Sequence, residues 1–139
     1  MDNATPGNTI HIERDSKSPT LIDASEQCFV IAAAMRDMPY HENLAAHLLW
    51  NSIRLILCHD CLAYLAGTPD RDSELHEISM HLYRHTGDDE YATIAKNLLP
   101  FDGLGRILVD AKMGRIKPHS DEQVNDLIEI RHRLICIKR

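Results

Sequence analysis

The chain has 139 residues, of which 44% are hydrophobic and 26% charged, as in one soluble globular domain. This composition excludes wholesale disorder, and the formal net charge of −6 gives a nucleic-acid partner no electrostatic basis for binding. No apolar run is long enough to cross a membrane, so a membrane-spanning protein is also excluded.

Residues 1–20 are polar and contain Pro6, Gly7 and Pro19, which predicts a flexible N-terminal arm. Within it, the alternating segment 9–14 could pair as a short strand. The opening MDNATPGNTIHIERD lacks the basic and apolar regions of a secretory signal. We therefore expect a cytoplasmic protein whose four cysteines are reduced.

Residues 21–139 are expected to form a single helical domain. Asp23 and Glu26 form a capping-box pattern before the apolar run CFVIAAAM, which predicts a first helix over 24–36. A long second helix, 42–66, is predicted to end at Gly67.

Four shorter helices complete the predicted fold. Ser73 can cap the third helix, Gly87 can end it, and Ser120 with Gln123 forms a capping box for the last one. The expected ranges are 73–85, 88–99, 102–113 and 121–137. No alternating strand pattern lies between these helices, so the chain is predicted to be an all-α single-domain bundle of about six helices.

The long helix 42–66 has two apolar faces on a helical wheel. A broad face holds Ala45, Leu49, Trp50, Ile53, Ile56, Leu57 and Tyr64. A narrow stripe with coiled-coil spacing holds Leu44, Leu48, Asn51, Leu55, Cys58 and Leu62. A helix at the rim of a bundle needs only one apolar face, so this helix is either central or meets another chain through the stripe. In the second case the single Asn would set the register.

The Cys-x-x-Cys of LILCHDCLAYLAG, formed by Cys58 and Cys61, lies in the middle of this helix. A reactive thiol pair needs its first cysteine at a helix N-terminus, so packing is the favoured interpretation. Zinc is the alternative, with His81 and His85 as the other ligands. The 19 residues between Cys61 and His81 exceed the spacer of about 12–15 that is typical of such sites.

The segment RDSELH, Arg71–His76, is similar to the Arg-polar-x3-His motif of the HEPN ribonucleases. This resemblance implies an all-α dimer that cleaves RNA with Arg71 and His76. RDMPYH (36–41) fits the same motif, RLILCH (54–59) fits it more loosely, and an acidic chain is poorly suited to RNA. The ribonuclease therefore ranks below zinc binding among the alternatives.

No spacing nominates a catalytic residue, a metal site or a cofactor. The favoured hypothesis is a small regulatory or inhibitory protein that is not an enzyme. It would bind another protein through the narrow stripe of helix 42–66 and self-associate as a homodimer.

Overall fold

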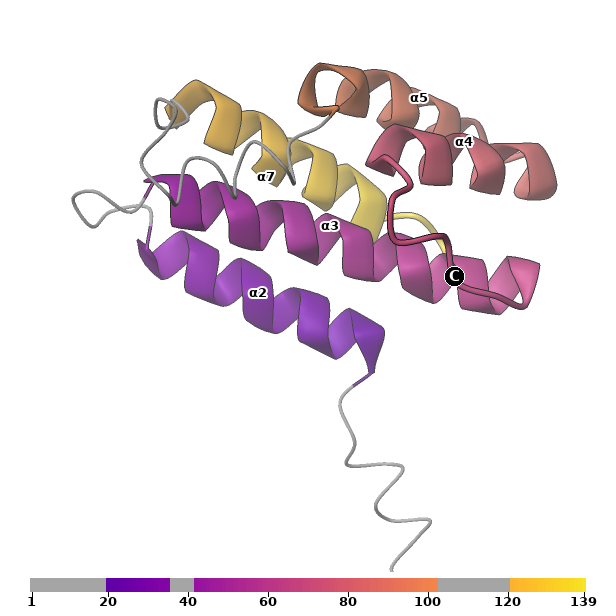
Figure 1. The fold of residues 1–139 in the computed structure, drawn as a ribbon, viewed down its shortest axis with the longest axis horizontal. Coiled ribbons are helices and arrows are strands. Elements are labelled where there is room, and N and C mark those ends of the chain that lie inside the picture. The colour runs from indigo at the N-terminus through magenta and orange to yellow at the C-terminus, as the bar shows by residue number, and fades with distance from the viewer. Residues whose placement is uncertain (1–19, 36–41, 103–120) are drawn as a thin grey trace, which may run out of the picture.

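The computed structural model describes residues 20–35, 42–102 and 121–139, and within these ranges the ordered elements are all helical (Figure 1). Its elements are α2 (Leu21–Met35), α3 (Glu42–Leu65), α4 (Leu75–Thr86), α5 (Asp89–Leu98), the 3-10 helix η1 (Leu99–Phe101) and α7 (Asp121–Ile135). The all-α prediction is confirmed. The described part of the chain contains five α-helices rather than six, because the helix expected over 102–113 falls almost wholly outside it. The predicted N-terminal arm, with its possible short strand, also lies outside the described residues, except for Thr20. No helix in the described ranges is long and apolar enough to cross a membrane.

The helix starts are set by caps that differ from those expected. The Thr20 hydroxyl accepts a hydrogen bond from the Asp23 N–H at 3.0 Å, and the Thr20 N–H donates to the Asp23 carboxylate at 3.3 Å. This reciprocal pair starts α2 three residues before the expected position. At α4, the Glu74 N–H donates to the Glu77 carboxylate at 2.8 Å, so the helix starts after Glu74 and not at Ser73.

Gly87 ends α4 as predicted. It has a φ of 74°, and its N–H donates to the Tyr83 carbonyl at 2.8 Å. This left-handed conformation is strained for any residue with a Cβ atom. Asp88 then caps α5 by accepting a hydrogen bond from the Glu90 N–H at 3.0 Å. The short link turns the chain back so that α4 and α5 pack together.

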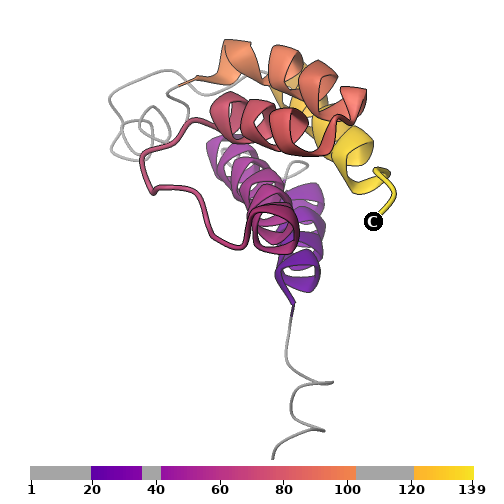
Figure 2. The same ribbon diagram turned by 90° about the vertical axis from the view of Figure 1, so that its right-hand side faces the viewer.

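The long helix α3 is central. It contacts α2 on one side and both α4 and α7 on the other, while α5 packs on α4 and α7 (Figures 1 and 2). The central position explains why this helix carries more apolar surface than a rim helix needs.

The broad face of α3 forms the middle of the core. Its fully buried members are Ala45, Leu49, Ile53, Ile56 and Leu57, and they belong to one cluster with residues of α4, α5 and α7. Burial of each large aliphatic side chain contributes about 1.5–3 kcal/mol. Two members of the predicted face differ: Trp50 is half-buried, and Tyr64 is exposed on the last turn of α3.

A buried polar cluster joins α2, α3 and α7. The hydroxyls of Ser25 and Ser52 lie 2.7 Å apart, and the Ser52 hydroxyl also accepts a hydrogen bond from the Arg131 Nε at 2.7 Å. Arg131 reaches α2 through Glu26 at 2.9 Å and packs its guanidinium over the Phe29 ring at 4.5 Å. These bonds fix how α2 and α7 sit on α3.

Replacing Ser52 with Ala should lower the free energy of unfolding by about 1–3 kcal/mol, because the buried Ser25 and Arg131 groups lose a shared partner. Urea unfolding measures the change. Ala63→Ser, at an exposed position of the same helix, is the control and should change stability little. Equal stabilities for Ser52→Ala and the wild type would show that the cluster does not hold the helices together.

Candidate protein-binding surface

The narrow stripe of α3 is only partly open. Leu44, Leu48, Leu55 and Cys58 are half-buried, and Leu48 packs against the core. The Asn51 side-chain amide donates to the Cys28 Sγ of α2 at 3.6 Å. In this arrangement Asn51 faces α2 of its own chain.

Leu62 is the exposed member of the stripe. Its side chain is 49% exposed, because the last turns of α3 extend past the start of α2 (Figure 1). Leu65, one turn further along, is half-buried and packs against the core. The open part of the stripe is therefore its C-terminal end.

A cleft of about 450 Å³ adjoins this end, between α3, the loop 66–74 and α4. Its floor is formed by Cys61, Leu65 and Ile78, and its rim carries Asp70, Glu77, His81 and Arg84. An apolar floor with a polar rim is the usual construction of a binding pocket. Leu65, which lines the cleft, is three residues after the exposed Leu62 on the same helix, so the two side chains are neighbours on α3.

Arg54 holds the loop that forms one wall of the cleft. Its guanidinium donates to the Asp70 carbonyl at 2.9 Å and to the Ser73 carbonyl at 3.2 Å. The same group lies 5.9 Å from the centre of the Trp50 ring. These contacts preform the wall.

A second apolar surface lies on α2, on the side away from α3. Val30 is 53% exposed and Ile31 is 44% exposed, with Gln27 and Ala34 exposed beside them. Their spacing of three and four residues places them on one side of the helix. We call these four residues the outer stripe of α2.

The two cysteines of the Cys-x-x-Cys do not form a reactive pair. Burial raises the pKa of Cys61 to about 11, and burial also raises the pKa of Cys58. Both thiols therefore stay protonated at neutral pH and are poor nucleophiles. This agrees with the packing interpretation.

The proposed zinc ligands are not gathered into a site. Cys61 and His81 both line the cleft, but the His81 ring packs edge-on against His85 at 4.6 Å, and Cys58 lies on the stripe. Within the described ranges, which include all four residues, no three Cys, His, Asp or Glu side chains are placed to hold a metal ion.

The HEPN-like pair is not brought together by any contact in the described ranges. Arg71 is exposed on the loop before α4, whereas the His76 Nδ1 lies 2.6 Å from a carboxylate oxygen of Asp102. The contact between His76 and Asp102 joins α4 to the residue after η1. Of the other two matches, Arg54 of RLILCH is bound to the loop carbonyls, and RDMPYH (36–41) lies outside the described ranges.

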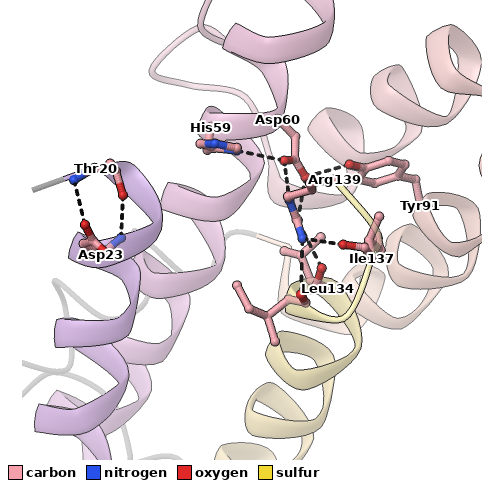
Figure 3. A network of polar contacts seen from close by, with 9 residues as sticks. Thr20, Asp23, His59, Asp60, Tyr91, Leu134, Ile137 and Arg139 are labelled. Carbon is pink, nitrogen blue, oxygen red and sulfur yellow. Dashed lines mark hydrogen bonds and ion pairs between the residues drawn. The ribbon is translucent and has the colours of Figure 1, made fainter. Parts of the chain in front are cut away.

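A buried carboxylate on α3 was not identified from the sequence (Figure 3). Asp60 is fully buried, and its two oxygens accept hydrogen bonds from the Arg139 guanidinium at 2.7 and 2.8 Å. The Tyr91 hydroxyl donates to it at 2.6 Å, and the His59 Nδ1 lies at 3.1 Å. Arg139 also donates to carbonyls at the end of α7, including that of Leu134 at 3.1 Å.

The electrostatics of this cluster favour the ionised carboxylate. Burial alone would raise the pKa of Asp60, but the hydrogen bonds from Arg139, Tyr91 and His59 outweigh it, and the pKa is lowered. Burial and the neighbouring carboxylate raise the pKa of Tyr91. Every oxygen of Asp60 is engaged, so the cluster is a structural joint between α3, α5 and the C-terminal end of the chain.

One signal for this joint was present in the sequence. Asp60 occupies the core face of α3, four residues after Ile56, and a carboxylate on an apolar face requires a partner. The spacing could not name Arg139, which is 79 residues away.

The lowered pKa of Asp60 predicts a specific loss of stability in acid. A carboxyl whose folded pKa is below its unfolded value stabilises the fold above about pH 4, and this contribution is lost as the pH falls through the folded pKa. The gap in unfolding free energy between the wild type and Asp60→Asn should therefore shrink from pH 7 towards pH 3. Asp126→Asn, at an exposed position, is the control. A gap that stays constant with pH would contradict the joint.

Comparison of the chain with known proteins assigns it to no family. No protein-family model matches the chain, and no curated protein or solved structure shows a significant match.

Proposed function

We propose that this chain is a small regulatory or inhibitory protein, without enzymatic activity, that binds another protein through the C-terminal end of the α3 stripe. The observation that carries the proposal is Leu62, a large aliphatic side chain left half exposed at 49% within a stripe of coiled-coil spacing. The half-buried Leu55 and Cys58 extend this surface towards α2.

The surroundings of Leu62 support a protein ligand. An exposed leucine by itself needs no explanation, but here it adjoins a preformed cleft with a polar rim. Interfaces commonly combine an apolar centre, a pocket that receives an anchor residue and a polar border. The end of α3 combines these features.

We also propose that the chain self-associates, with the outer stripe of α2 as the dimer interface. Asn51 and the middle of the α3 stripe already face α2, whereas Val30 and Ile31 have no neighbour covering them among the described residues. The stripe carries no charge, and Ala34 allows close approach of a second helix. Two copies can therefore pack through identical surfaces about a twofold axis.

Leu62→Asp should abolish capture of the partner protein, because the charge would have to be buried in an apolar contact. The measurement compares proteins retained from lysate by the immobilised wild type and the variant. Leu99→Asp is a matched control, since Leu99 on η1 is 50% exposed. Equal retention by both variants would contradict the proposed surface, provided circular dichroism shows that both are folded.

Val30→Asp should convert a dimer into a monomer, because two like charges would meet near the twofold axis. Native mass spectrometry or light scattering over a concentration series measures the change. Asn97→Asp is the control, as Asn97 is exposed on α5, which packs on α4 and α7. If Val30→Asp leaves the dimer intact, the outer stripe of α2 is not the dimer interface.

A further inference from the structure

We propose that the cleft between α3, the loop 66–74 and α4 receives a basic side chain of the partner protein, foremost an arginine. The aliphatic stem would lie on the floor, and the cationic head would meet carboxylates at the rim. This inference rests on the proposed function, because the side chain belongs to the protein bound at Leu62.

The floor suits an aliphatic stem. Cys61 is 2% exposed and Ile78 is 3% exposed, so both are almost fully buried at the base of a cleft that remains open above them. The Cys61 thiol makes no hydrogen bond to any of the described residues, and with a pKa of about 11 it carries no charge. The floor is therefore neutral, and the half-buried Leu65 supplies the apolar surface on which the methylene groups of a long basic side chain can lie.

The rim favours a cation at one end. Asp70 and Glu77 lie at the N-terminal end of α4, and one Glu77 oxygen accepts the Glu74 N–H at 2.8 Å, which leaves the other oxygen for a ligand. Arg84 is seven residues after Glu77, about 10 Å further along the helix axis. The carboxylates of the rim therefore lie at the end opposite Arg84. The Arg54 guanidinium beside Asp70 is already bound to two backbone carbonyls and brings the net charge around the cleft to zero, so a cation would be held by the placement of the two carboxylates and not by net charge.

Arg54 makes the carboxylate end rigid. Because it binds the Asp70 and Ser73 carbonyls, the loop is held before a ligand arrives. A preformed site loses less conformational entropy on binding than a mobile one. A planar guanidinium that can donate to two carboxylates fits this end better than a compact ammonium.

The test is a titration of the isotope-labelled full chain with N-acetyl-arginine amide, followed by NMR amide shifts. We expect shifts concentrated in residues 67–84. Asp70→Asn and Glu77→Gln should each weaken binding several-fold, and Arg84→Gln should strengthen it. The Gln side chain at position 77 can still accept the Glu74 N–H, so the start of α4 is preserved. Glu122→Gln, at an exposed position on α7, is the control.

Three results would overturn the inference. They are the absence of shifts at the cleft, an equal response to N-acetyl-glutamate amide, and binding that is unaffected by Asp70→Asn and Glu77→Gln. Tighter binding of N-acetylagmatine, which has the same charge as the capped arginine but lacks its carboxamide group, would instead indicate a small-molecule cation and would contradict a partner side chain.

The outcome separates this inference from the proposed function. If the arginine probe does not bind but Leu62→Asp abolishes partner capture, the function stands and the occupant of the cleft is wrong. If the probe binds but Leu62→Asp leaves capture unchanged, Leu62 is not part of the partner-binding surface. The assignment of the cleft to a side chain of that partner is then also wrong.

Discussion

The buried carboxylate of Asp60 is the constraint on which the arrangement of the helices depends. A fully buried charge is tolerated only when it is paired and hydrogen-bonded. Its partners come from three places: His59 beside it on α3, Tyr91 on α5, and Arg139 after α7. Their bonds fix the rotation of α3 about its axis and hold the C-terminal end of the chain against it. This orientation of α3 determines that Cys61 faces the cleft and Leu62 faces the surface.

The four residues of the CHDC segment therefore have four separate structural roles. Cys58 lies half-buried on the stripe, His59 contacts the carboxylate, Asp60 is the buried joint, and Cys61 forms the floor of the cleft. One residue later, Leu62 emerges at the surface. Successive residues of a helix point about 100° apart, so neighbours in the sequence reach different surroundings. The CHDC segment resembles a metal or redox motif in sequence, but its four side chains point in different directions around a central helix.

Helical periodicity and stop signals account for what the sequence could predict. The long apolar pattern and Gly67 place α3 at 42–66, one residue from its observed end at Leu65, and the buried broad face follows from the same period. The start of α2 was missed because Thr20 and Asp23 form the cap in place of the pair one turn later. Periodicity could identify two apolar faces on α3, but it could not say that α2 covers the stripe at Asn51 and leaves Leu62 open. That depends on where another helix ends in space.

We propose that this protein acts through apolar surfaces and not through the chemistry of its cysteines and histidines. Native mass spectrometry of the wild-type chain, purified without chelator or metal resin, tests it most directly. We expect a dimer whose mass is that of two polypeptides alone. A protomer heavier by one zinc ion, with the extra mass lost in Cys58→Ser, would contradict it and make the CHDC segment a metal site.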